Sequence, residues 1–80
     1  MNTKEFVDLG QRMVVEYYNR YVNKRKKINK ENVEIRNLYI DSDDKIEVSF
    51  VTNTEYDKNI YNIVYEPFLK EIHSYLTELN

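Results

Sequence analysis

The apolar residues in the first third of the chain recur at the spacing of an α-helix. One stripe consists of Phe6, Leu9, Met13, Tyr17 and Tyr21. A second row beside it consists of Val7, Val14, Tyr18 and Val22. We therefore expect an amphipathic helix from Asn2 to about Lys27, capped by Asn2 with Glu5 three residues on. Gly10, the only glycine, falls inside it and predicts a close packing contact there.

The middle of the chain has the residue types and the turn of a β-hairpin. Residues 33–40 are rich in β-branched and aromatic side chains, and their alternation changes phase, which predicts a bulge near Asn37. The polar run 41–44 predicts a turn, and Ile46, Val48 and Phe50 then alternate with polar residues as in a strand with one buried face.

The last third of the chain supports two interpretations. Residues 58–66 have strand-like composition, and Pro67 favours an extended residue before it, which predicts a third strand followed by a helix over 67–79. The apolar positions also fit one long helix kinked at Pro67. This helical stripe consists of Ile60, Ile63, Val64, Phe68, Ile72, Tyr75, Leu76 and Leu79.

These elements predict one small α+β domain over residues 1–80. The expected order is α-β-β-β-α, with two helices on one face of a short antiparallel sheet, and the alternative is α-β-β-α with a long Pro-kinked C-terminal helix. The first order resembles that of the double-stranded RNA-binding domain. The segment 66–71 lacks the lysine-rich motif of that family, so none of its RNA-contacting residues is assigned here.

The charges are sorted along the chain. Residues 1–30 hold eight Lys or Arg and three Asp or Glu, whereas residues 31–80 hold four and eleven, and the total is −2. The absence of cysteine favours a reducing compartment, and there is no signal-peptide pattern or apolar run long enough for a membrane span. We therefore expect a cytoplasmic protein, in the host cytoplasm if it is phage-encoded, with one basic and one acidic surface for partners.

An acidic turn is the first candidate site. Its expected protein-binding residues are Asp41, Asp43, Asp44, Glu47, Tyr39, Tyr56 and Tyr61, and Glu55, Asp57 and Glu66 extend the carboxylate row. A row of carboxylates can imitate the phosphates of DNA, and tyrosine is common at protein interfaces. A calcium loop is not predicted. If Asp41 were its first residue, Lys45 would stand where an oxygen ligand is needed, Ile46 where glycine is needed and Thr52 where glutamate is needed. An ordinary polar turn is the alternative interpretation.

A basic segment is the alternative site, for nucleic acid. It comprises Arg20, Lys24, Arg25, Lys26, Lys27 and Lys30, with Tyr17, Tyr18 and Tyr21 nearby for base stacking. The competing interpretation is a solvated helix end, where the helix dipole favours cations.

No pattern in the chain indicates an enzyme. His73 is the only histidine and has no evident partner, the serines carry no nucleophile motif, and a single glycine does not make a phosphate loop. We expect no catalytic residue, no metal site and no cofactor.

The function predicted from the sequence is therefore a non-enzymatic protein-binding module. Its most concrete form is a phage or mobile-element inhibitor of nucleic-acid machinery, of the anti-defence or anti-CRISPR type, because the chain is small, acidic and biased toward AT-rich codons: Asn, Lys, Ile and Tyr make up 33 of 80 residues. The expected partner is a basic, nucleic-acid-handling protein, with homodimerisation as a further option. The alternative is a small nucleic-acid-binding regulator that uses the basic segment.

Overall fold

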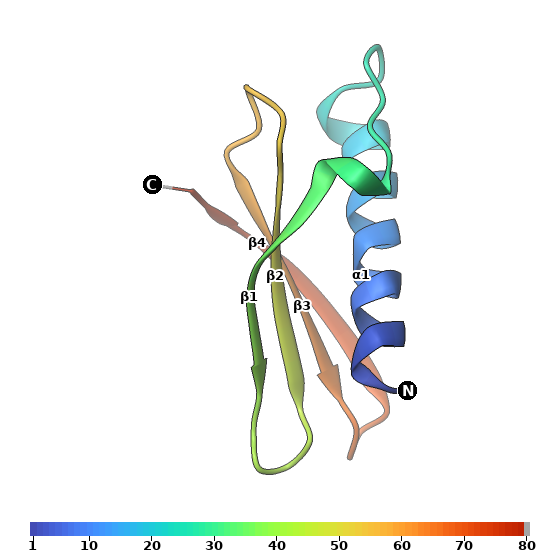
Figure 1. Ribbon diagram of the computed structural model, residues 1–80, viewed down its shortest axis with the longest axis vertical. Coiled ribbons are helices and arrows are strands. Elements are labelled where there is room, and N and C mark those ends of the chain that lie inside the picture. The colour runs from blue at the N-terminus through green and yellow to red at the C-terminus, as the bar shows by residue number, and fades with distance from the viewer. Residues whose placement is uncertain (80) are drawn as a thin grey trace.

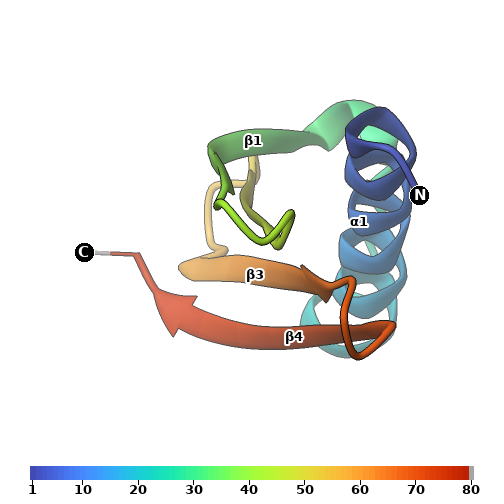
Figure 2. The same cartoon turned by 90° about the horizontal axis from the view of Figure 1, so that it is seen from below.

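One helix packs on one face of a four-stranded antiparallel sheet. The computed structural model describes residues 1–79 and contains α1 (Thr3–Tyr17), β1 (Val33–Ile40), β2 (Ile46–Thr52), β3 (Asn59–Glu66) and β4 (Glu71–Glu78). The strands follow one another as a meander in the order β1-β2-β3-β4 (Figure 1). Figure 2 shows the sheet curling beside the helix. A π-helical turn (Tyr18–Val22) extends α1, and a 3₁₀ turn (Lys30–Asn32) leads into β1.

The helix begins as its sequence predicts and ends earlier. Asn2 caps it: the Glu5 N–H donates to Asn2 Oδ1 at 2.8 Å, and Asn2 Nδ2 donates to Glu5 Oε1 at 2.7 Å. Helical structure stops at Val22 rather than near Lys27, because Asn23 Oδ1 accepts the N–H groups of Arg25 and Lys26 and so turns the chain.

Gly10 lies where the helix meets the sheet, as predicted. A Cβ atom at this position would lie 2.6 Å from Phe50 Cε2, so only glycine lets α1 approach β2 this closely. Side chains one helical turn apart bury the same face of α1 against the inner sides of β2 and β3. The most fully buried side chains between the helix and the sheet are Phe6, Val14, Val48, Phe50 and Ile63.

The hairpin predicted for residues 33–52 is confirmed, including its bulge. The register shifts between Ile35 and Asn37, which brings both halves of β1 into phase with β2. Ile46, Val48 and Phe50 face the helix and are buried. Residues 59–66 form strand β3, the first of the two predicted interpretations for this segment.

The second helix predicted for residues 67–79 is wrong, and so is the long Pro-kinked helix. Pro67 to Lys70 form a tight turn, closed by the Lys70 N–H donating to Pro67 O at 3.3 Å, and the chain returns as β4. Proline can take the first position of this turn, because it lacks an N–H but keeps the C=O that accepts from Lys70. Because the C-terminal helix is absent from the described residues, the element order no longer resembles that of the double-stranded RNA-binding domain.

A tertiary requirement explains why a strand forms there. β3 lies inside the sheet with Tyr61 to Val64 buried, so its second edge of N–H and C=O groups needs partners. β4 supplies them along the full length of β3, in a register from Asn59 opposite Glu78 to Glu66 opposite Glu71. A helix at this place would leave the backbone of β3 unpaired.

Candidate binding surfaces

The turn between β1 and β2 is built around Asp41. Asp41 Oδ1 accepts the N–H groups of Asp43 at 2.9 Å and Lys45 at 3.1 Å, and the Asp41 N–H donates to Lys45 O at 3.1 Å. Asp44 takes a left-handed conformation with φ 60°, which Asp tolerates better than most residues. Asp41 therefore supplies the side-chain acceptor that holds the turn, while the side chains of Asp43 and Asp44 are exposed and form no hydrogen bond among the described residues.

A second turn, Pro67 to Lys70, lies at the same end of the sheet, because strands in a meander reverse direction at alternate ends. Lys45 on the first turn forms an ion pair of 3.7 Å with Glu66, which immediately precedes the second. Phe68 at the tip is 92% exposed and Leu69 is 58% exposed. We call the two turns and the residues beside them the acidic end; it comprises Asp41, Asp43, Asp44, Glu66, Phe68, Leu69 and Glu71.

Glu47 and Tyr39 lie beside the acidic end, on the face of the sheet that α1 does not cover. They are directly opposite each other on β2 and β1. Tyr75 on β4 reaches across this face, and its hydroxyl donates to Glu47 Oε1 at 2.8 Å. This hydrogen bond to a carboxylate raises the pKa of Tyr75, because the hydroxyl must keep its proton to donate it. Glu47 is thus partly engaged within the sheet.

Two tyrosines of the predicted protein-binding set lie away from the acidic end. Tyr56 is 85% exposed, but it belongs to the loop between β2 and β3 at the other end of the sheet. Tyr61 is 4% exposed and faces α1, and its hydroxyl donates to Asp57 Oδ2 at 2.7 Å. Burial and this hydrogen bond raise the pKa of Tyr61. Tyr61 is therefore a core residue, whereas Tyr56 lies on a different surface.

Asp57 was expected to extend the carboxylate row, and the structure gives it a different place. It is buried and accepts hydrogen bonds from Thr52 Oγ1 at 2.7 Å, from Tyr61, and from the backbone and side chain of Asn59 at 3.0 and 2.9 Å. Glu55 lies in the same loop, so of the three added carboxylates only Glu66 joins the acidic end. Sequence reasoning missed this cluster because no single residue type marks it.

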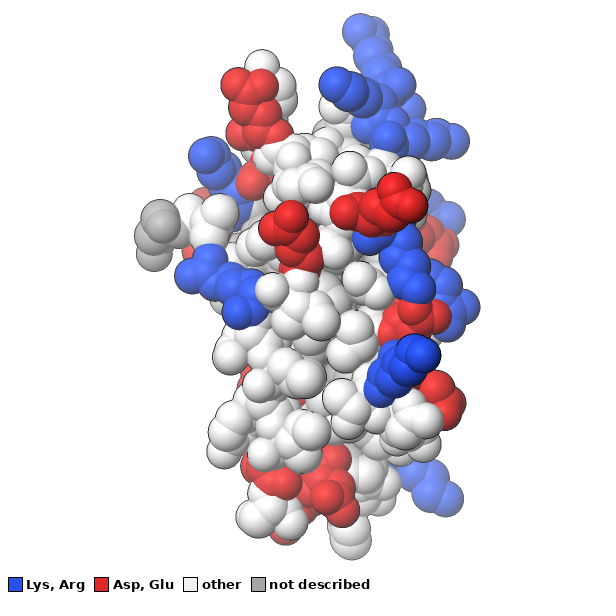
Figure 3. Space-filling view, viewed as in Figure 1, with Lys and Arg blue, Asp and Glu red and all other residues white. Residues whose placement is uncertain are grey.

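The basic segment lies at the opposite end of the molecule. Figure 3 shows Lys and Arg gathered over the loop that follows α1, with Asp and Glu gathered at the other end of the longest axis, which measures 40 Å. Arg20 pairs with Glu16 at 3.3 Å, and Lys30 pairs with Asp8. Lys24, Arg25, Lys26 and Lys27 have no ion pair within residues 1–79, and we call these four the basic end.

The position of the basic end changes its interpretation. The four cations follow Val22, where the helix stops, so most of them lie beyond the last turn in which the helix dipole acts. The nearby tyrosines differ in access. Tyr18 is buried, Tyr17 packs against Tyr21 with the ring centres 5.0 Å apart and the planes tilted by 48°, and Tyr21 is 66% exposed. Glu16, Asn19, Arg20, Lys24 and Lys27 line a shallow depression beside them.

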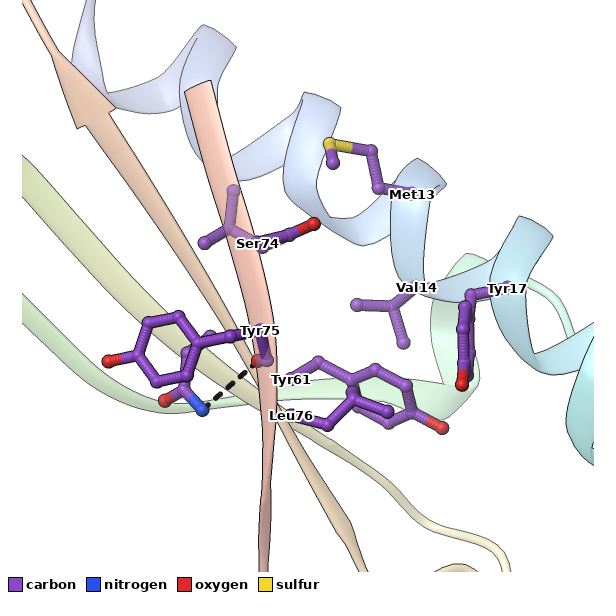
Figure 4. A pocket seen from close by; sticks show the side chains of 9 residues that line it. Met13, Val14, Tyr17, Tyr61, Ser74, Tyr75 and Leu76 are labelled. Carbon is purple, nitrogen blue, oxygen red and sulfur yellow. Dashed lines mark hydrogen bonds between the residues drawn. The ribbon is translucent and has the colours of Figure 1, made fainter. Parts of the chain in front are cut away.

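A groove between α1 and β4 is a surface that the sequence did not reveal. It has a volume of about 250 Å³, and Met13, Val14 and Tyr17 of α1 face Ser74 and Leu76 of β4 across it (Figure 4). The groove exists because α1 packs on β1, β2 and β3 and leaves the inner face of β4 only partly covered. Reading residues 67–79 as a helix concealed it.

The structure adds little chemistry to these surfaces. Within residues 1–79, no three His, Asp or Glu side chains are grouped so that they could hold a metal ion. His73 Nε2 lies 3.1 Å from Glu71 Oε2 on the exposed strand β4. Among the described residues, no helix is long and apolar enough to cross a membrane.

Comparison with protein-family models, with curated proteins and with solved structures finds no match to this chain. The arrangement of its surfaces is therefore the basis for a functional proposal.

Proposed function

We propose that this chain is a protein-binding module that docks its acidic end on a basic surface of another protein. The observation that carries the proposal is that the acidic turn at residues 41–44 lies beside the turn Pro67 to Lys70, which Glu66 and Glu71 flank. The Lys45 to Glu66 ion pair joins the two turns, and Phe68 is exposed at the tip of the second. Carboxylates around exposed apolar anchors are a common composition for an interface: the apolar groups give affinity, and the charges give orientation and rate.

The availability of the carboxylates supports this choice. Asp43 and Asp44 form no side-chain hydrogen bond or ion pair among the described residues, so the fold makes no use of their charge. Negative charge concentrated on a turn repels itself and is stabilised when a cationic partner approaches. A surface that binds nucleic-acid phosphates is such a partner, and an inhibitor of nucleic-acid machinery is the concrete form of this proposal.

The test is affinity capture of partners from a bacterial lysate by the tagged chain, with and without nuclease. We expect a protein partner that survives nuclease treatment and is released at high salt, because the contact is largely between charges. Phe68→Ala is expected to reduce the capture, with Tyr56→Ala at the opposite end as the matched exposed aromatic control. Recovery of nucleic acid alone would contradict the proposal.

A second candidate is nucleic-acid binding by the basic end. It is favoured by one observation: the four cations are free of ion pairs within the described part of the chain and stand beside the exposed Tyr21. Fluorescence anisotropy with a labelled single-stranded oligonucleotide tests it. Affinity should fall steeply between about 50 and 200 mM salt if the four cations neutralise phosphates. No binding at low salt would remove this candidate.

A further inference from the structure

Strand β4 is an unpaired and regular sheet edge. All eight of its side chains are exposed, and the strand contains no proline and no bulge. Natural proteins usually protect such an edge, since its free N–H and C=O groups can pair with another strand. The other edge strand, β1, is interrupted by its bulge between Ile35 and Asn37. β4 is therefore the edge better suited to pairing.

The ladder between β3 and β4 fixes which backbone groups of β4 are free. The Leu79 N–H donates to Lys58 O at 2.7 Å, and antiparallel ladders alternate between hydrogen-bonded and non-hydrogen-bonded pairs. Thr77, Tyr75, His73 and Glu71 therefore direct their backbone groups toward β3. The residues between them, Ile72, Ser74, Leu76 and Glu78, direct theirs outward.

The sequence of β4 is complementary to itself in one antiparallel register. With Ser74 opposite Ser74 of a second copy, Ile72 lies opposite Leu76, His73 opposite Tyr75 and Glu71 opposite Thr77. Lys70, in the turn that precedes the strand, would come near Glu78 of the second copy, so charges of opposite sign would meet at both ends of the seam. A shift of one strand by two residues in either direction places Ile72 opposite Glu78 or Ser74 and loses this match.

In this register the second copy would bury apolar residues on the inner face of β4 that are exposed in the monomer. Ile72 is 37% exposed and Leu76 is 42% exposed, because α1 covers the inner face of β4 only in part. In the paired arrangement each Ile72 packs on the Leu76 of the other copy. The two grooves would join into a single channel between the two α1 helices, with Ser74 at its centre.

We propose that the protein forms a homodimer by antiparallel pairing of β4 with β4 of a second copy, with Ser74 on the two-fold axis. The product is a continuous eight-stranded sheet with both helices on one face. Of each acidic end only Glu71 lies in the seam, so the dimer still presents both copies of the turn at residues 41–44.

Sedimentation and single-cysteine crosslinking test this proposal. The chain has no cysteine, so Ser74→Cys introduces the only thiol. Opposed Cα atoms at a hydrogen-bonded pair lie about 5.5 Å apart, which a disulfide can span. Thr77→Cys is the matched control, because its two copies would lie roughly 20 Å apart. We expect the wild-type chain to sediment as a dimer and only Ser74→Cys to crosslink.

Two further variants separate pairing from folding. Ser74→Pro removes an outward N–H that β3 does not use, so it should raise the dimer dissociation constant roughly 100-fold while the monomer stays folded. Lys70→Glu should weaken the dimer, and Lys70→Glu with Glu78→Lys should restore it. A wild-type monomer at about 100 μM, or crosslinking through Thr77→Cys in place of Ser74→Cys, would overturn the proposal.

Discussion

The two ends of the molecule carry opposite charge, and they are built differently. At the end that bears the basic loop, partly or fully buried polar side chains hold the backbone. The half-buried Asn19 bonds both the N–H and the C=O of Ile28, at 2.8 and 3.0 Å, and the buried Asp57 accepts four hydrogen bonds. At the acidic end, Asp41 and Pro67 form two short turns, and most other carboxylates are exposed.

This difference separates residues that stabilise the fold from residues that are free to bind. Charged side chains at the acidic end can be changed with little effect on folding, Asp41 excepted. Polar residues under the basic loop cannot, because each satisfies buried backbone or side-chain groups. The stability of variants at the two ends therefore tests the comparison directly.

The largest expected effect on stability is at Asp57. Asp57→Ala leaves Thr52 Oγ1, Tyr61 Oη and the two Asn59 donors without their acceptor. We expect a loss of about 3 kcal/mol in the free energy of unfolding, measured by urea titration. Glu55→Ala in the same loop is the control and should change it by less than about 0.5 kcal/mol. Similar losses for both variants would contradict this account of the loop.

Asn19→Ala is expected to cost about 2 kcal/mol, because the N–H and C=O of the buried Ile28 both lose their partner. Glu16→Ala, one turn away on the exposed side of α1, should cost less than about 0.5 kcal/mol. The same urea titration measures both. An Asn19 variant as stable as the wild type would show that the loop after α1 holds its position without this side chain.

Within the acidic turn, neighbouring aspartates should behave differently. Asp41→Ala removes the acceptor of two backbone N–H groups and should cost about 1 kcal/mol. Asp43→Asn with Asp44→Asn keeps the turn, since Asn also tolerates the left-handed backbone at 44, and should change stability by less than about 0.5 kcal/mol. Equal losses would mean that the exposed carboxylates also stabilise the turn.

At Tyr61 the expected effect is a change in the pH dependence of stability, and it is confined to alkaline pH. Its pKa is raised in the folded state, so the folded form binds the hydroxyl proton more tightly than the unfolded chain does. This contribution is complete below about pH 10, the ordinary tyrosine value, and is lost as the pH rises above it. Tyr61→Phe should therefore flatten the alkaline decline in unfolding free energy by up to about 1.4 kcal/mol per pH unit. An unchanged slope would contradict the burial of this hydroxyl.

The elements that local sequence specifies were predicted correctly. The Asn2 and Glu5 cap, the apolar stripe of α1, the turn at 41–44 and the bulge in β1 depend on residues a few positions apart. β4 could not be predicted in this way, because Ile72, Tyr75 and Leu76 fit both a helix and a strand. The deciding contact, the unpaired edge of β3, is a property of the assembled sheet.

The positions of some candidate site residues could be predicted from the sequence for the same reason. Asp41, Asp43 and Asp44 lie together because they share one turn. Tyr56 and Tyr61 were grouped with them by composition, although the direction of the strands separates them: the loop after the second strand must lie at the other end from the turn before it. The burial of Tyr61 and Asp57 depends on where α1 crosses the sheet, which no local pattern encodes.

The most direct test of the proposed function compares two charge variants in partner capture. One carries Asp43→Lys and Asp44→Asn at the acidic end, and the other carries Lys24→Glu and Arg25→Glu at the basic end; all four residues are exposed. We predict that the acidic-end variant loses its protein partner by at least about tenfold, or 1.4 kcal/mol, while the basic-end variant retains it. Loss of the partner by the basic-end variant alone would contradict the account.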